Sequence, residues 1–114
     1  MESFGALLRE RRRMANISQR DLATRAGLDF SYISKLENDR LPAPAADTIV
    51  TLCRILGTPP QELLAASGKL PQHTHETVST SPAAQQFLES ATEMKLTEEE
   101  WREIASSLHR LRER

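Results

Sequence analysis

The sequence has few of the residues that would support a fold held by covalent links, metal ions or a membrane. Its 114 residues include one cysteine, Cys53, which excludes an internal disulfide and a cysteine-based zinc site. No apolar run approaches the ~18 residues that a membrane span requires, and the first residues lack the pattern of a secretory signal. We therefore expect a cytoplasmic protein whose fold depends on packing alone.

The chain also has little net charge, because 15 basic and 16 acidic residues leave a formal charge of −1. Residues 1–70 carry ten Lys/Arg and eight Asp/Glu, a charge of +2, whereas residues 71–114 carry five and eight, a charge of −3. This balance excludes a uniformly basic nucleic-acid binder. A protein of this composition that bound DNA would have to place its cations locally and read the duplex with mostly neutral side chains.

Motifs for catalysis are missing as well. The chain has no phosphate-binding glycine loop, no Gly-x-Ser-x-Gly elbow and no zinc-protease motif. His73 and His75 form a His-x-His pair that we interpret as part of a linker, with metal binding as the alternative. Cys53 lies on an apolar helical stripe, which favours a structural thiol over a redox sensor. We expect no enzymatic activity, no cofactor and no metal site.

Apolar residues recur at helical spacing through residues 1–70, and strand signals are nearly absent. Five short helices are predicted: residues 3–15, residues 18–26, residues 29–38, a helix between Pro44 and Gly57, and a helix that begins within residues 58–61. Ser18 and Asp29 have side chains that can cap the second and third helices, and Thr58 can cap the fifth. The sequence therefore predicts an all-α domain in which one small core is shared by five helices.

The remaining chain differs in composition. Residues 71–81 are rich in proline, threonine, serine and histidine, which is typical of a linker. Residues 82–114 are predicted to form two helices, the second opened by a capping box at residues 97–100. Their apolar side chains follow helical spacing and form a candidate dimerisation surface: Phe87, Leu88, Trp101, Ile104, Leu108 and Leu111.

The second and third predicted helices are joined at Gly27, which suits a tight turn, and Ala23 is small enough to let the helices approach. This is the pattern of a helix-turn-helix. The solvent face of the third helix is expected to present an apolar ring, neutral hydrogen-bonding groups and one cation, which together can read base edges in the major groove of DNA. These residues are Phe30, Ser31, Tyr32 and Lys35.

Each of these features has a plainer explanation. The two helices could belong to a helical bundle that binds nothing, and Tyr32 could be a packing residue as easily as a base reader. Arginines between Arg9 and Arg13 could form a solvated helix face. Phe30 is harder to explain in this way, because the buried side of its helix is already supplied by Ile33 and Leu36. We expect Phe30 to contact a thymine methyl or an apolar neighbour.

Taken together, several short motifs resemble one known family. They are Phe4-Gly5-x-Leu7-Leu8-Arg9, Ile17-Ser18-Gln19-x-x-Leu22-Ala23, Ala26-Gly27-Leu28, Ser31-Tyr32-Ile33-Ser34-Lys35-Leu36-Glu37, Leu56-Gly57 and Leu63-Leu64. Over about residues 3–70 the chain resembles the lambda-repressor and Cro-type (XRE) helix-turn-helix proteins. With its short helical tail, it is also similar to small Bacillus regulators of that family.

The resemblance implies a five-helix DNA-binding domain over residues 1–70, a linker over residues 71–81 and a helical interaction segment over residues 82–114. It also implies that Gln19 holds a phosphate and that Arg12 pairs with Glu37. The complete set of implied DNA contacts is Ser18, Gln19, Phe30, Ser31, Tyr32, Lys35, Asn38 and Arg40. The family often has glycine where this chain has Asp39, which places a negative charge near the expected phosphate path.

The apolar stripe of the tail needs a partner, because a hairpin of about 30 residues cannot bury it alone. That partner could be the N-terminal domain, a second copy or another protein. We expect a homodimer, since a two-fold dimer can read both halves of a palindromic operator. We therefore expect a bacterial or phage DNA-binding regulator of transcription that acts as a repressor. The alternatives are an antitoxin, a regulator whose tail mainly binds an antagonist or protease, and a helical scaffold without a DNA role.

Overall fold

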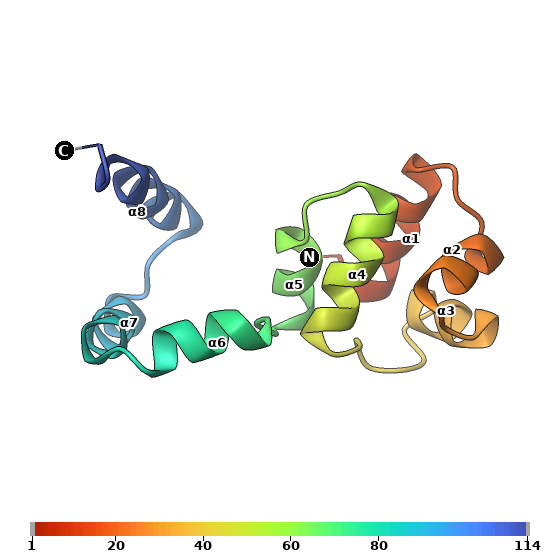
Figure 1. The fold of residues 1–114 in the computed structure, drawn as a ribbon, viewed down its shortest axis with the longest axis horizontal. Helices are drawn as coiled ribbons and strands as arrows, with labels where there is room; N and C mark the ends of the chain where they lie inside the picture. Colours follow the sequence, from red (N-terminus) through yellow and green to blue (C-terminus); the bar gives the residue numbers. More distant parts are fainter. Residues whose placement is uncertain (1, 114) are drawn as a thin grey trace. The chain divides into compact units, whose positions relative to one another are not determined.

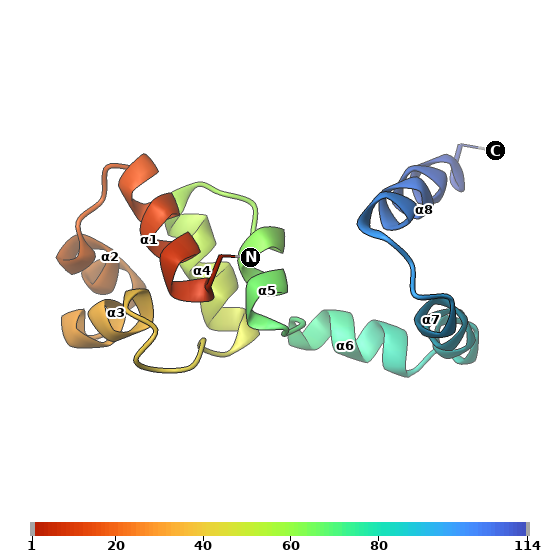
Figure 2. The ribbon, with the colours of Figure 1, turned by 180° about the vertical axis from the view of Figure 1, so that it is seen from behind.

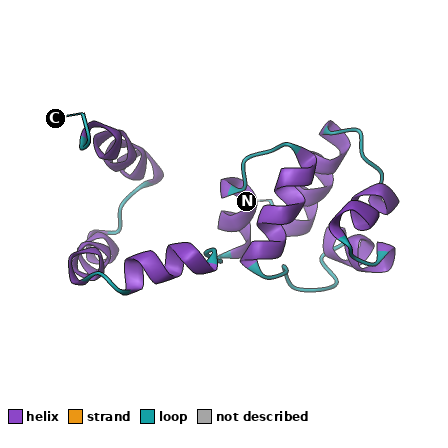
Figure 3. Ribbon diagram, viewed as in Figure 1, coloured by secondary structure: helices purple, strands orange, loops and turns teal. Residues whose placement is uncertain are grey.

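The computed structural model describes residues 2–113, and the regular structure within them is entirely helical (Figure 3). Its helices are α1 (Phe4–Met14), α2 (Gln19–Ala26), α3 (Phe30–Glu37), α4 (Ala46–Leu56), α5 (Gln61–Ser67), α6 (Gln72–Ser79), α7 (Pro82–Met94) and α8 (Glu98–Arg110). They divide into two compact units that meet between His75 and Glu76. The all-α prediction is confirmed.

The first unit packs α1 to α5 around one core, as predicted. Figures 1 and 2 show α2 and α3 side by side at one end of this unit, next to α1 and α4. Each of the five helices contributes at least one apolar side chain that is almost fully buried. The core comprises Phe4, Leu8, Leu22, Ala23, Ile33, Leu36, Ile49, Leu52, Cys53, Leu56 and Leu63.

Most of the predicted helix ends are confirmed. The Ser18 Oγ accepts a hydrogen bond from the backbone N–H of Asp21 at 3.0 Å and caps α2. Gly27 ends α2 in the left-handed conformation, with φ of 69°, which glycine adopts without a steric penalty. In α8, Thr97 and Glu100 form the predicted capping box, with bonds of 3.0 and 3.2 Å.

Two predicted caps are wrong. Asp29 precedes α3, but its side chain makes no capping bond, because the N–H of Tyr32 is already bound to the backbone carbonyl of Asp29 at 3.1 Å. Thr58 does not cap α5, which begins at Gln61 after Pro60. Pro60 has no N–H to donate to a hydroxyl two residues earlier, and α5 nevertheless begins within residues 58–61, as predicted.

The start of α1 is fastened to the end of α3. A methyl group at Gly5 would lie 2.3 Å from the carbonyl oxygen of Leu36, so the backbones approach too closely for any side chain here. The Asp39 carboxylate accepts hydrogen bonds from the Gly5 N–H at 3.0 Å and the Ser3 hydroxyl at 2.7 Å. Asp39 thus serves the first turn of α1, where the helix dipole favours a negative charge.

Helix α6 was not predicted from the sequence. It lies in the segment expected to be a linker, and none of its residues is buried. The prediction rested on composition, which indicates exposure to solvent but not backbone conformation. From Gln72 to Ser79 there is no proline or glycine to interrupt a helix, and the carbonyl of Pro71 accepts a bond from His75 N–H at 3.0 Å at its start.

The second unit contains α7 and α8, both as predicted. Ser81 caps α7 by accepting a bond from the Ala84 N–H at 3.1 Å, with Pro82 in the first helical turn. The rings of Phe87 and Trp101 join the two helices edge to face, with centroids 6.4 Å apart. Large apolar side chains nevertheless remain exposed along both helices, so this unit has an incompletely covered apolar surface.

Candidate nucleic-acid interface

Helices α2 and α3 form a helix-turn-helix whose inner side is held by the core. Leu22 and Ala23 of α2 and Ile33 and Leu36 of α3 are almost fully buried. The turn is closed by a hydrogen bond of 2.8 Å from the Leu28 N–H to the Ala23 carbonyl. Because these contacts fix one side of α3, its opposite side is presented to solvent in a fixed orientation.

The buried carboxylate of Glu37 connects the first three helices. Its two oxygens accept bonds from Arg12 Nε at 2.6 Å and Arg12 Nη2 at 3.0 Å, a bidentate pair. Gln19 Nε2 donates a further bond at 3.0 Å, and Arg9 Nε lies 3.5 Å away. Arg12 also donates to the Ile17 carbonyl at 2.9 Å. The pairing of Arg12 with Glu37 that the resemblance implied is confirmed.

Electrostatics keep this pair charged. Burial alone would raise the pKa of Glu37, but the hydrogen bonds from Arg12 and Gln19 and the charges of Arg12 and Arg9 together lower its pKa below the ordinary value. The hydrogen bond to Glu37 raises the pKa of Arg12 in turn. The ion pair therefore fixes α1 against α3 throughout the neutral range.

The two residues predicted at the start of α2 are both involved in local bonds. Gln19 is half-buried and directs one amide N–H to Glu37, so the predicted phosphate contact has its second N–H available. Ser18 uses its oxygen as a cap, which leaves its hydroxyl hydrogen to donate elsewhere.

On the outer side of α3, Ser31 and Lys35 are exposed, and 40% of the Phe30 surface is accessible. Tyr32 differs from them. It is half-buried and packs against the core, as the packing alternative for this residue predicted. The open face of α3 is therefore centred on Ser31 and Lys35, and the rings of Phe30 and Tyr32 flank it on opposite sides.

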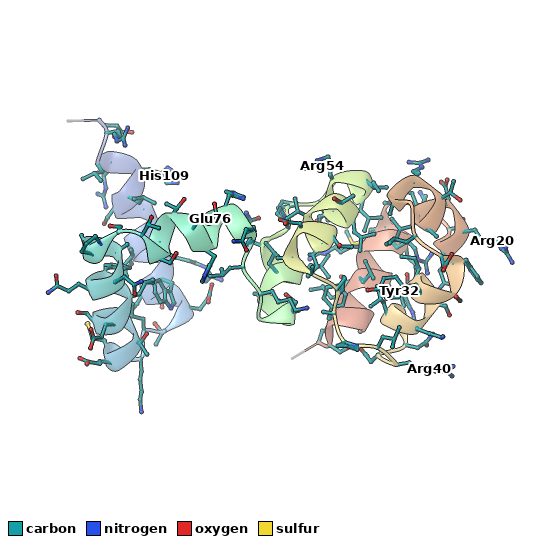
Figure 4. The ribbon with its side chains drawn as sticks, turned by 60° about the horizontal axis from the view of Figure 1, so that its bottom comes forward. Arg20, Tyr32, Arg40, Arg54, Glu76 and His109 are labelled. Atoms are coloured by element: carbon teal, nitrogen blue, oxygen red, sulfur yellow. The ribbon has the colours of Figure 1, made fainter. Side chains whose placement is uncertain are left out.

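The end of α3 carries the remaining predicted contacts. Asn38 accepts a bond from Arg9 Nη2 at 2.8 Å and donates one to the Ser34 carbonyl at 2.8 Å, so its amide is held in place. Arg40 is exposed and extends away from the domain (Figure 4).

A solvated face was one explanation offered for the arginines of α1, but three of them form ion pairs, of which the family resemblance implied only the pair of Arg12 with Glu37. Arg9 and Arg12 pair with Glu37, and Arg11 pairs with Glu62 of α5. Sequence spacing did not reveal these pairs, because their partners lie 25 to 51 residues away along the chain.

Arg20 also lies at this surface and was not predicted from the sequence. Its guanidinium carbon lies 4.5 Å from the centre of the Phe30 ring, so the cation of α2 covers the ring at the start of α3. The side chain is exposed and projects outward (Figure 4). The only sequence signal for it was its place directly after Gln19, in the first turn of α2.

Within residues 2–113, no group of three or more side chains could hold a metal ion, and no helix is long and apolar enough to cross a membrane. Cys53 is buried in the core, and burial raises the pKa of its thiol despite the nearby charge of Arg11. A raised pKa disfavours the reactive thiolate.

Comparison with known proteins agrees with this geometry. Residues 3–66 match a family described as "Helix-turn-helix domain". The chain belongs to this family. Two relatives of the helix-turn-helix chain come from Bacillus subtilis (strain 168). One is named an uncharacterized HTH-type transcriptional regulator, RghRB, and is 34% identical over 89 residues, which are 78% of this chain and 64% of that protein. The other is the HTH-type transcriptional repressor RghR, 32% identical over 91 residues, or 80% of this chain and 67% of that protein.

The chain thus spans slightly less than two thirds of the first of these relatives. Among solved structures, a chain of the SinR protein/SinI protein complex has the same fold, with a TM-score of 0.52 and 19% identity over 97% of this chain and 99% of that chain. The XRE-like fold predicted from the sequence motifs is confirmed, together with the likeness to Bacillus regulators.

Proposed function

We propose that this helix-turn-helix chain is a sequence-specific regulator of transcription that binds double-stranded DNA in the bacterial cytoplasm and acts as a repressor. The observation that carries the proposal is the outer side of α3, where Ser31 and Lys35 are exposed while Ile33 and Leu36 lock the inner side. A helix held in this way fits the major groove. The names of the two relatives, a transcriptional regulator and a transcriptional repressor, support the same function.

We further propose that α7 and α8 join two copies of the chain. Leu108 and Leu111 are 63% and 49% exposed, and with Phe87 and Ile104 they line an apolar hollow of about 470 Å³. Such a surface is stabilised when a partner covers it. The sequence of α8 suits a second copy placed antiparallel, because its first turn carries Glu98, Glu99 and Glu100 and its end carries Arg110 and Arg112.

A dimer of this kind would place two α3 helices on the two halves of a palindromic operator, with half-site centres about 34 Å apart or a multiple of that distance. Binding of one half-site makes the second effectively intramolecular, which raises the affinity without any new contact. Lys35 and Ser31 would read base edges, while Gln19, Ser18, Asn38 and Arg40 would hold the backbone.

The same apolar surface supports a second candidate function, in which the tail mainly binds an antagonist, a protease or a toxin. The solved neighbour is a complex of two named proteins, SinR and SinI. Sedimentation equilibrium of the purified chain separates the candidates. A stable dimer that Leu108→Glu converts to monomer supports self-association, with Ser106→Glu, on the opposite face of α8, as the matched control. A chain that is monomeric at every concentration supports the second candidate.

A further inference from the structure

Arg20 and Phe30 lie on different helices and form one contact at the DNA-facing surface. The Arg20 guanidinium carbon is 4.5 Å above the centre of the Phe30 ring. Phe30 is the first residue of α3, and Arg20 is the second residue of α2. Within residues 2–113, no carboxylate forms an ion pair with Arg20, although Arg25 on the same helix pairs with Asp21 at 3.0 Å.

Stacking on a ring leaves the hydrogen-bonding capacity of a guanidinium intact. The five N–H donors of arginine lie in the plane of the group and point away from its faces. The ring of Phe30 therefore restricts the orientation of Arg20 without using any donor. An arginine restricted in this way loses less conformational freedom when it binds, which favours a directional contact over a diffuse one.

The chemistry of the pair matches two features of the major groove. A guanine offers O6 and N7, which an arginine can contact with two parallel N–H bonds, and a thymine offers its C5 methyl to an apolar group. The residues at the beginning of a recognition helix are those that reach base edges in this architecture. Phe30 occupies that position, and its contact with Arg20 brings a guanidinium beside it.

We propose that Arg20 and Phe30 act as one specificity-determining unit that reads a thymine and a neighbouring guanine in each half-site. Phe30 contacts the thymine methyl, and Arg20, held against the ring, donates to O6 and N7 of the guanine. This inference rests on the proposed DNA-binding function and adds to it a residue of α2 and a base-pair preference.

The experiment begins with the full chain and duplexes selected from a random pool, followed by binding measurements on the preferred duplex. Arg20→Ala is expected to lower affinity about 5- to 150-fold and to abolish the preference for guanine at one position per half-site. Arg20→Lys is expected to recover only part of the guanine preference, because lysine keeps the charge but lacks the planar pair of parallel donors. Arg25→Ala is the matched control, exposed on the same helix, and should leave the preference unchanged.

Modified duplexes test the atoms directly. Replacing the guanine by 7-deazaguanine, or the thymine by uracil, should weaken binding by the unmodified chain. The first change should have no effect on Arg20→Ala and the second none on Phe30→Ala. If Arg20→Ala weakens all duplexes equally and lysine restores binding, Arg20 is a phosphate contact and the inference is overturned. If the unmodified chain shows no preference among duplexes, the proposed function itself fails.

Discussion

Removing Arg12 should destabilise the first unit strongly, because it leaves a buried carboxylate without its main partner. The Glu37 side chain is 0% exposed and Arg12 is 11% exposed. In Arg12→Met, Glu37 keeps only the Gln19 amide at 3.0 Å and Arg9 at 3.5 Å. Breaking a buried pair in this way costs about 3–5 kcal/mol. A small domain has only about 5–15 kcal/mol of total stability, so the midpoint of thermal unfolding should fall by roughly 15 °C or more.

The paired change separates a lost interaction from lost packing. Glu37→Met also costs stability, since it strands the Arg12 guanidinium and the Gln19 amide. The double variant Arg12→Met/Glu37→Met removes both charges and should cost no more than the worse single variant. Urea unfolding followed by circular dichroism measures all three. Arg25→Met, which removes an exposed pair with Asp21, should cost less than about 1 kcal/mol and serves as the control. If the stability cost of the double variant equals the sum of the costs of the two single variants, the coupling between Arg12 and Glu37 is refuted.

The same variants have a predicted pH dependence. Folding lowers the pKa of Glu37, so its contribution to stability is present above the unfolded value of about 4.3 and is lost as the pH falls through the lower folded value. In Arg12→Met, burial outweighs the remaining donors and the folded pKa rises. The stability difference between Arg12→Met and the unmodified chain should therefore shrink as the pH falls from the raised pKa of Glu37 in the variant to its lowered pKa in the unmodified chain. A difference that stays constant on acidification would contradict the assignment.

Three further predictions concern other parts of the first unit. Gly5→Ala should cost about 3 kcal/mol of stability, measured by urea unfolding, because the added methyl group would clash with the Leu36 carbonyl. Gly57→Ala, where an added methyl group meets no atom but φ is positive, should cost only about 1–2 kcal/mol. Equal costs for the two variants would contradict the close approach at Gly5. Lys35→Ala should cost ~1–3 kcal/mol of DNA-binding free energy and relax one base preference, whereas Gln19→Ala should weaken binding to all duplexes alike. If both variants lose the same affinity for every duplex, this division of roles is refuted. Cys53 should react with thiol reagents only as the domain unfolds, so fast labelling under native conditions would be inconsistent with its buried place and raised pKa.

The helices of the first unit could be predicted from the sequence because their signals are local. Apolar spacing identified the buried sides of α1 to α5, and Ser18 and Gly27 marked where α2 begins and ends. The missing caps at Asp29 and Thr58 could not be predicted in the same way. A cap depends on which N–H groups remain unbound, and composition does not determine this.

Predictions for the site divide in the same way between local and long-range sequence signals. The outer residues of α3 follow from the helical period once its buried side is known. The contacts of Arg20, Arg9 and Asp39 do not, because each joins helices whose relative placement is fixed only by the folded core. The prediction that Arg12 pairs with Glu37 came from the family resemblance and not from the residues alone.

The central claim is that the outer side of α3 reads DNA, and selection of duplexes from a random pool with the full chain tests it most directly. The account predicts enrichment of two inverted half-sites with centres about 34 Å, or a multiple of that distance, apart, and loss of one base preference in each half-site in Lys35→Ala. A pool that stays random, or an enriched sequence that Lys35→Ala selects equally well, would contradict it.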